Sequence, residues 1–265
     1  MIRLAERPWP AAARLARDPR SVVLLPLGAV EQHGPHLPLL VDWLGAEELA
    51  RRIAPHLRRA GWRPILLPGL PYGASPLARG FAGTISLSAR TLTAVASEIL
   101  EALVAHGFRR FVLANYQADP AHLEAMARIK RRVERRRAVR VLFAGFAPAT
   151  QAQRAMTNAR VTRLLRSPRP DREWHSGEME TSLVLAVRPR LVRARVARRL
   201  PPHWTDFRAA LAAGRSFREM DTTGRGYFGW PAAARAATGR RGLVLRARLI
   251  AGVVLAGLGR PVRTR

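Results

Sequence analysis

The chain has 265 residues, enough for one large α/β domain with a sizeable core, and 48% of them are hydrophobic, as in ordinary globular proteins. It contains no cysteine, which excludes disulfides and cysteine-ligated zinc or iron–sulfur sites, so any metal must be held by histidine, carboxylates, amides and water. The formal net charge is +28 and comes from arginines spread over the whole sequence. We interpret this spread as a compositional bias and do not expect a nucleic-acid partner, although a positive field would favour an anionic substrate.

No segment predicts export or membrane insertion. The first 20 residues carry several arginines and lack the long apolar core of a secretory signal. The apolar stretch at 249–258 is too short to span a bilayer. We therefore expect a cytoplasmic protein with no membrane partner.

Short apolar runs alternate with stretches of helical periodicity. In chain order we predict a strand at 21–27, a helix at 45–54, a strand at 63–67, a helix at 88–106, a strand at 110–114, a helix at 120–137, a strand at 139–145, and helices at 178–187 and 242–258. The segment at 68–83 is rich in turn residues, and those at 146–172 and 200–237 predict loops and small elements that cover one side of a site. This alternation predicts a three-layer α/β/α fold with a mainly parallel central sheet, which we interpret as one domain over 1–265.

The first chemically interesting residues follow the strand at 21–27 directly. Glu31 and His33 stand two residues apart, and Asp42 follows nine residues after His33. Ligands of a parallel sheet bind where its strands end, and Zn²⁺, Mn²⁺ and Fe²⁺ accept carboxylate and imidazole together. Residues that merely cap a turn also show this spacing, so the spacing alone predicts a metal site only weakly.

The whole string around these residues is more specific than its spacing. The stretch GAVEQHGPHLP at 28–38, followed by Asp42, resembles the opening motif of the creatininase family. Later stretches resemble family motifs in the same order: YGAS at 72–75, FAGTIS at 81–86, HGFRR at 106–110, WHSGEMETS at 174–182 and GYFGWP at 226–231. The resemblance covers most of the chain and identifies it as a divergent member of the family.

Members of this family are metal-dependent amidohydrolases, and the resemblance assigns roles to individual residues. It implies that three side chains bind metal, with the last of them able to bridge two ions: Glu31, His33 and Asp42. It also implies that Glu178 is a ligand or reaches the activated water, and that His175 polarises the substrate or transfers protons. Hydrogen bonding at a helix start is the alternative for Glu178 and His175, and it is the preferred interpretation of Glu180.

The largest departure from the family follows the strand at 110–114. Members carry Asn-Gly-His there, with a Glu two residues later in the creatininases, whereas this chain has Asn-Tyr-Gln-Ala-Asp at 115–119. Gln117 therefore replaces a ligand histidine, and Asp119 stands at the position of a metal-binding Glu. An amide oxygen is a much poorer ligand than imidazole, so the centre would hold one or two ions of Zn, Mn or Fe.

The resemblance implies substrate contacts from four residues: Tyr72, Ser75, Ala118 and Trp174. Leu77 and Ala78 stand where the family often has a Glu-His pair, and Trp230 replaces an Asp, which makes the pocket more apolar and less suited to creatinine itself. We expect hydrolysis of an amide or cyclic-amide C–N bond in a small molecule or modified peptide by metal-activated water. Two alternatives stay open: non-hydrolytic cyclisation or condensation, and a pseudoenzyme subunit. A homo-oligomer, a hexamer by the resemblance, is also expected.

Overall fold

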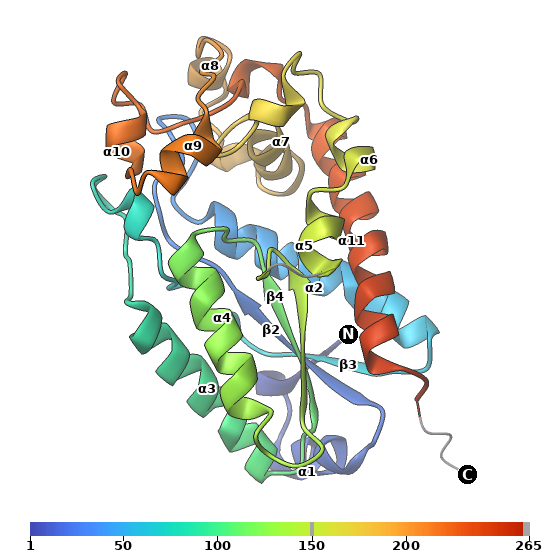
Figure 1. Ribbon diagram of the computed structural model, residues 1–265. Helices are drawn as coiled ribbons and strands as arrows, with labels where there is room; N and C mark the ends of the chain where they lie inside the picture. The colour runs from blue at the N-terminus through green and yellow to red at the C-terminus, as the bar shows by residue number, and fades with distance from the viewer. Residues whose placement is uncertain (149–150, 262–265) are drawn as a thin grey trace.

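The computed structural model of the protein describes residues 1–148 and 151–261. A five-stranded sheet lies between two layers of helices (Figure 1). The strands are β1 (Ile2–Arg3), β2 (Ser21–Leu27), β3 (Arg63–Leu66), β4 (Arg110–Asn115) and β5 (Arg140–Gly145), in the spatial order β1-β3-β2-β4-β5. Every neighbouring pair is parallel, so the predicted three-layer fold with a parallel central sheet is confirmed.

Two hydrophobic cores form because successive side chains of a strand face opposite sides of the sheet. Leu24 and Val112 face the layer of α2 (Val41–Arg59), α7 (Glu178–Val187) and α11 (Ala236–Leu258). Leu25 and Phe111 face the layer of α1 (Trp9–Arg17), α3 (Ala89–Ala105) and α4 (Pro120–Val133). Because β2 and β4 are buried on both faces, they form continuous apolar runs, which the sequence pattern predicts well.

Several boundaries differ from the prediction. Helix α2 begins at Val41 and continues through Pro55 to Arg59. Helix α4 ends at Val133, four residues early, and α11 begins at Ala236, six residues early. Gly239 weakens the helical pattern at the start of α11, but it is needed there, because a Cβ at this position would collide with the Ser182 carbonyl of α7.

The segments expected as loops carry short helices. These are α5 (Gln151–Met156), α6 (Ala159–Thr162), α9 (Phe207–Ala212) and α10 (Phe217–Met220), with α8 (Ala194–Ala197) just before the second segment. Helices α8, α9 and α10 gather near α7 at the end of the molecule opposite α1 (Figure 1). In the part of the chain that the structure describes, no helix is both long enough and apolar enough to cross a membrane.

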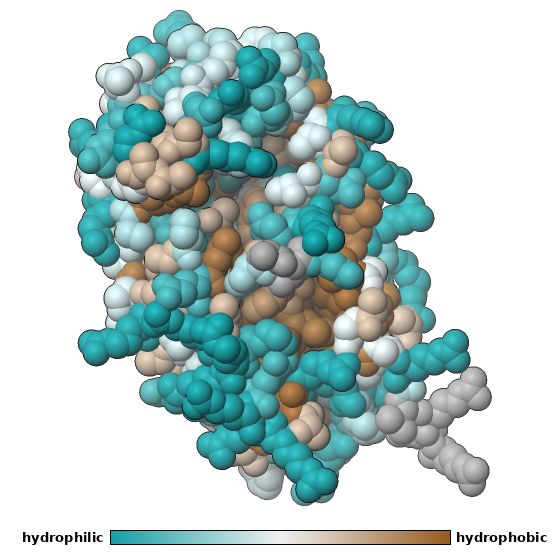
Figure 2. All heavy atoms as spheres, viewed as in Figure 1, coloured by the Kyte–Doolittle hydropathy of each residue, from teal (hydrophilic) through white to brown (hydrophobic). Residues whose placement is uncertain are grey.

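The hydrophilic character of the surface agrees with the many charged residues in the sequence. On the face drawn in Figure 2 hydrophilic side chains predominate, and hydrophobic ones gather in a band in the middle of the face. The spread of hydrophilic groups agrees with arginines distributed over the whole chain.

Candidate metal centre

Three chain segments meet beyond the carboxyl ends of β2 and β4. Glu31 and His33 follow β2, Gln117 follows β4, and His175 and Glu180 flank the start of α7. Asp42 joins them from the first turn of α2. Gly28 makes this approach possible, since a Cβ there would lie within 2.5 Å of the Trp43 backbone nitrogen.

His33 is the central residue of the cluster. Its Nδ1 lies 3.1 Å from the backbone carbonyl oxygen of Glu31, and since a carbonyl only accepts, Nδ1 carries a proton and donates it. Its Nε2 lies 3.7 Å from Asp42 Oδ1 and 3.8 Å from Glu180 Oε2. His33 Nε2 and Asp42 Oδ2 are both buried, and neither has a hydrogen-bond partner among the described residues. Buried polar atoms are normally satisfied, so this pair of atoms fits the ligand set of a cation.

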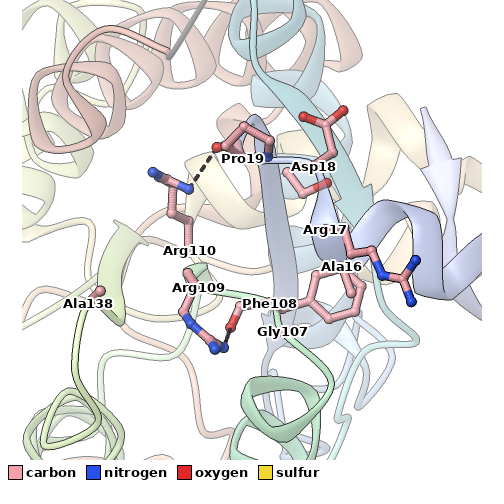
Figure 3. Close-up of a pocket in the computed structure, with 10 residues that line it drawn as sticks. Ala16, Arg17, Asp18, Pro19, Gly107, Phe108, Arg109, Arg110 and Ala138 are labelled. Carbon is pink, nitrogen blue, oxygen red and sulfur yellow. Dashed lines mark hydrogen bonds between the residues drawn. The ribbon is translucent and has the colours of Figure 1, made fainter. Parts of the chain in front are cut away.

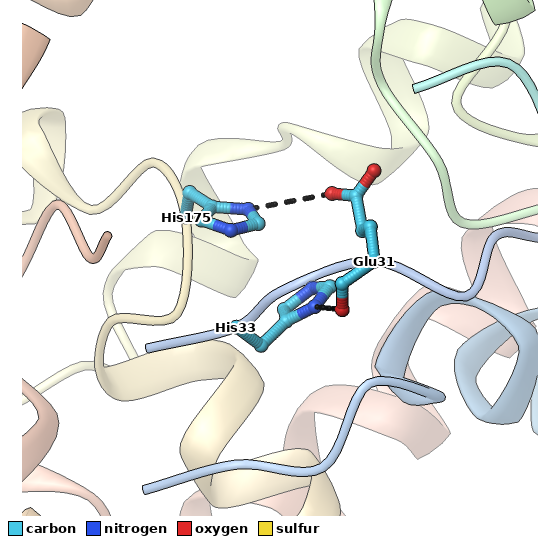
Figure 4. Close-up of side chains that lie close together, drawn as sticks. All are labelled: Glu31, His33 and His175. Atoms are coloured by element: carbon cyan, nitrogen blue, oxygen red, sulfur yellow. Dashed lines mark hydrogen bonds and ion pairs between the residues drawn. The ribbon is translucent and has the colours of Figure 1, made fainter. Parts of the chain in front are cut away.

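His175 forms a second group with Glu31 and His33 (Figure 4). Its Nδ1 lies 3.9 Å from Glu31 Oε1, and its ring centroid is 4.4 Å from that of His33. Its Nε2 lies 2.9 Å from the Gln32 carbonyl oxygen and 3.1 Å from the Gln32 side-chain nitrogen. We assign the proton to Nε2, which satisfies the nearer carbonyl, and Nδ1 then faces Glu31. In each of the two groups, Glu31–His33–His175 and His33–Asp42–Glu180, the potential ligand atoms lie within 4.8 Å of one another.

Gln117 reaches the centre with its nitrogen. Its Nε2 donates hydrogen bonds to the Glu31 carboxylate and, over 2.9 Å, to Ser75 Oγ. Its Oε1 accepts from the backbone N–H of Asp119 at 2.9 Å. The Asn115 side chain holds the loop by donating to the Gln117 carbonyl at 2.7 Å and accepting from the Gln117 N–H at 3.0 Å. The amide is therefore oriented by its own partners.

Two residues expected at the metal lie outside both groups. Asp119 caps α4, accepting from the Ala121 N–H at 2.9 Å and from the Leu77 N–H at 3.2 Å. The Glu178 carboxylate accepts from the backbone N–H groups of Arg166 and Ser167 at 2.7–2.9 Å. Both carboxylates thus accept hydrogen bonds from backbone N–H groups of neighbouring segments.

Glu180 takes the place expected for Glu178. Two residues apart on a helix, the side chains point about 200° apart, so only one of the pair can face the centre. The start of α7 at Glu178 puts Glu180 on the side of His33 and Asp42. Its Oε2 also accepts from the Ser176 N–H at 2.6 Å, which orients the carboxylate. The signal in the sequence was the second Glu of the 174–182 stretch. The predicted helix at 178–187 has the observed bounds, but choosing between the two residues also needs the side of the helix that faces the centre, which the sequence pattern does not give.

Burial and crowding shift the acidities of the cluster. Burial, reinforced by the nearby Asp42 charge, raises the pKa of Glu31 to about 8. Burial also raises the pKa of Glu180. Burial opposes charging of His33, but the surrounding carboxylates, Asp42 first, prevail and raise its pKa to about 10. Burial and the neighbouring His33 push the pKa of His175 well below its usual value.

An aromatic cover lies over the centre. Phe217 packs on His175 with 4.5 Å between ring centroids, and Trp174 stacks on Phe207 at 5.4 Å. These rings come from α9, α10 and the strand-like segment before α7, and they share a hydrophobic cluster with Leu77. Phe207 and Phe217 were not predicted from the sequence, because their segment has no clear periodicity.

The expected substrate contacts are divided between interior and surface. Ser75 is fully buried beside Gln117, and Trp174 belongs to the aromatic cover. Tyr72, at 44% exposure, and Ala118 are exposed. The structure therefore brings only Ser75 and Trp174 next to the buried centre.

A cavity of about 290 Å³ lies at the other end of the sheet (Figure 3). It opens at the amino ends of β2 and β4, away from the cluster described above. The guanidinium of Arg110 donates to the Pro19 carbonyl at 2.7 Å, and that of Arg109 donates to the Phe108 carbonyl at 3.0 Å.

Comparison with known proteins supports the resemblance. The family model described as "Creatininase: Creatinine amidohydrolase" matches residues 5–254. The chain is 30% identical to the mycofactocin precursor peptide peptidase of Mycobacterium tuberculosis (strain CDC 1551 / Oshkosh) over 229 residues, covering 83% of this chain and 78% of that protein. It is 39% identical to the creatinine amidohydrolase of Pseudomonas putida over 99 residues, 36% of each chain, so this match spans about a third of that relative's length.

A solved structure agrees with the sequence relatives. A mutant creatininase described as "Zn-Zn type" superposes with a TM-score of 0.73 at 26% identity, covering 96% of this chain and 97% of that one. The fold, the family model and the relatives give one answer: the chain belongs to the creatininase family, a family of metal-dependent amidohydrolases.

Proposed function

We propose that this protein is a metal-dependent hydrolase of an amide or cyclic-amide C–N bond in a small molecule or modified peptide. One observation carries the proposal: buried His33 Nε2 lies 3.7–3.8 Å from a carboxylate oxygen of Asp42 and of Glu180. Neither this nitrogen nor Asp42 Oδ2 has a hydrogen-bond partner among the described residues. One imidazole and two carboxylates suit Zn²⁺ or Mn²⁺. A divalent ion bound there would polarise the carbonyl under attack and lower the pKa of the attacking water.

His175 is the proposed proton carrier. Its Nε2–H is held by the Gln32 carbonyl, so Nδ1 is the nitrogen available to accept a proton and later release it to the leaving nitrogen. The rings of Phe217 and His33 both pack against the imidazole, with 4.5 and 4.4 Å between ring centroids, and so restrict where Nδ1 points. The proposed substrate contacts are Ser75 and Trp174, with Tyr72 and Ala118 left for parts of a substrate that extend to the surface.

The aromatic cover and the positive net charge of the protein together indicate the class of substrate. Phe217, Trp174 and Leu77 would contact an apolar part of the substrate next to the centre. The net charge of +28 would attract a substrate that also carries an anionic group. Relatives named as acting on creatinine and on a precursor peptide agree with a small cyclic amide or a peptide end.

A second candidate function is non-hydrolytic ring closure or condensation at the same centre. Two observations favour it: the centre is almost closed to water by Phe217, and a ligand histidine of the family is replaced by Gln117. Such a reaction releases water, whereas hydrolysis consumes it.

The test separates the two directions of reaction. The protein is freed of metal, reloaded with Zn²⁺ or Mn²⁺, and given a panel of cyclic amides and N-acyl compounds in H₂¹⁸O. We expect metal-dependent turnover that places ¹⁸O in the product carboxylate, as mass spectrometry would detect. Turnover of open-chain acids to cyclic amides without net hydrolysis would favour the second candidate, and failure to bind either metal would refute both.

A matched variant tests the role of His175. We expect His175→Ala to reduce turnover strongly while it retains the metal of the wild type. Loss of metal in this variant would make His175 a ligand and would contradict its proposed role.

A further inference from the structure

We propose that the centre binds a single ion, at His33, Asp42 and Glu180, and that the Gln117 amide excludes a second ion from the side of Glu31. The inference rests on the proposed function only in that a divalent ion binds. It departs from the "Zn-Zn" form described for the solved creatininase.

The two potential ligand groups share one histidine, His33. Both groups include His33, whose Nδ1 donates to the Glu31 carbonyl, so Nε2 is the nitrogen that faces the carboxylates. A single imidazole lone pair binds a single ion. The groups Glu31–His33–His175 and His33–Asp42–Glu180 therefore compete for His33, and two ions cannot both use it.

Free ligand atoms are distributed unequally between the two groups. In the group with Asp42 and Glu180, Asp42 Oδ2 has no partner among the residues that the structure describes. One carboxylate oxygen in each group already accepts a hydrogen bond, that of Glu31 from Gln117 and that of Glu180 from the Ser176 N–H, so the unpartnered oxygen of Asp42 is the difference. The Asp42–Glu180 group also offers two negative charges to a divalent ion, and the other group offers one. The ion is therefore expected beside Asp42 and Glu180.

The direction of the Gln117 amide is fixed by its partners. Its oxygen, the only atom that could bind a metal, accepts from the Asp119 N–H, and its nitrogen donates to Glu31 and Ser75. Reversing the amide would set its NH₂ against the Asp119 N–H and leave a buried donor unsatisfied, which costs about 1–3 kcal/mol. An N–H bond pointing at Glu31 repels a cation, so the side chain that replaces the family histidine opposes an ion there.

The decisive measurement is the number of ions per chain. Metal-free protein is titrated with Zn²⁺ by calorimetry, and its metal content after dialysis is determined by elemental analysis. We expect one ion in the wild type, one in Glu31→Gln, and none in Glu180→Gln. Gln117→His is expected to gain a second ion, whereas Gln117→Ala, which removes the N–H without adding a ligand, keeps one.

Each contrary result is specific. Two ions in the wild type would overturn the inference. So would loss of the ion in Glu31→Gln with retention in Glu180→Gln, because the ion would then sit in the group with His175. If folded Gln117→His, checked by circular dichroism, stays at one ion, the amide is not what excludes the second.

The outcome is also distinct from that of the proposed function. One ion with no turnover on any amide would uphold the single site and refute the hydrolase. Two ions with metal-dependent hydrolysis would refute the single site and uphold the hydrolase.

Discussion

The ring of Phe217 covers the imidazole of His175, with 4.5 Å between the ring centroids and 42° between the ring planes. Phe217 is only 5% exposed, and it begins helix α10, whose first turn is closed by reciprocal hydrogen bonds between Ser216 and Glu219. The next residue, Arg218, donates to the Gly80 carbonyl at 2.7 Å and lies over the ring of Phe81. The cover is thus attached to the segment at 80–81, a few residues after the expected substrate contact Ser75.

Removing this ring should open the centre. We expect Phe217→Ala to cost about 3–5 kcal/mol of stability and to speed the loss of bound metal to a chelator, because the ring that covers His175 is gone. The measurement is the rate of Zn²⁺ transfer to a chelating dye. Phe108→Ala is the matched control, since Phe108 is similarly buried in the core on the other face of the sheet. Equal rates in both variants would show that Phe217 does not limit access.

Glu178 should matter for stability and not for metal. Its carboxylate accepts from two backbone N–H groups, those of Arg166 and Ser167, so Glu178→Leu would leave both donors without their acceptor. We expect a loss of about 1–3 kcal/mol of unfolding free energy in denaturant titration, with unchanged metal content. If the variant stays folded but loses its metal, Glu178 is a metal ligand and this prediction is wrong.

The parts of the fold that the sequence predicted well are those that depend on local pattern. Strands β2 and β4 are apolar apart from Ser21, Arg110 and Asn115 at their ends, because both faces are buried, and α3 begins at the Ser88 cap and ends before Gly107. Ile2–Arg3 and α1 were missed. The two-residue strand β1 is too short to show a period, and the apolar pattern of α1 is interrupted by arginines.

In the candidate site, too, the residues that form a local motif were predicted, and the features set by tertiary structure were not. Glu31, His33 and Asp42 were found through one continuous motif, although their ligand roles stay predictions. The bounds of α7 were predicted correctly, but the difference between Glu178 and Glu180 depends on which side of this helix faces the centre, and that is set by tertiary packing. The direction of the Gln117 amide depends on the Asp119 N–H and on Glu31, 86 positions away in sequence, so composition and spacing cannot give it. The contact of Phe217 with His175 is likewise set by tertiary structure.

A glycine of α2 should set the position of the Gln117 loop. A Cβ at Gly45 would lie 2.5–2.8 Å from ring atoms of Tyr116, the residue before Gln117, and the Tyr116 hydroxyl accepts from Arg246 at 2.5 Å. We expect Gly45→Ala to lower the unfolding free energy by about 1–3 kcal/mol, because the buried ring must move. Gly252→Ala is the matched control in α11: nothing lies within 4 Å of its added Cβ, so a gain of about 0.5–1 kcal/mol is expected. Similar effects of both substitutions would refute the proposed clash.

Glu173 should make the stability of the site region depend on pH. Its carboxylate accepts from the backbone N–H groups of Glu178 at 2.6 Å and of Trp230 at 3.0 Å, and so joins the start of α7 to the 226–231 turn. Burial is the main cause that raises the pKa of Glu173 from 4.5 to about 7. The folded state therefore binds a proton more tightly than the unfolded state. The resulting stabilisation is present below about pH 4.5 and is lost as the pH rises to about 7.

Glu173→Gln removes this titration while it keeps the size of the side chain. The two pKa values differ by about 2.5, which corresponds to on the order of 3 kcal/mol. In denaturant titrations at several pH values from 4 to 8, we expect the wild type to lose stability relative to the variant by this order as the pH rises through the window. The amide introduced in the variant would leave one backbone donor without an acceptor. That cost is the same at every pH, so it changes the size of the stability difference between wild type and variant but not its dependence on pH. A difference that stays flat between pH 4 and 8 would mean that Glu173 titrates alike in the folded and unfolded states, and that burial at this junction does not hold its proton.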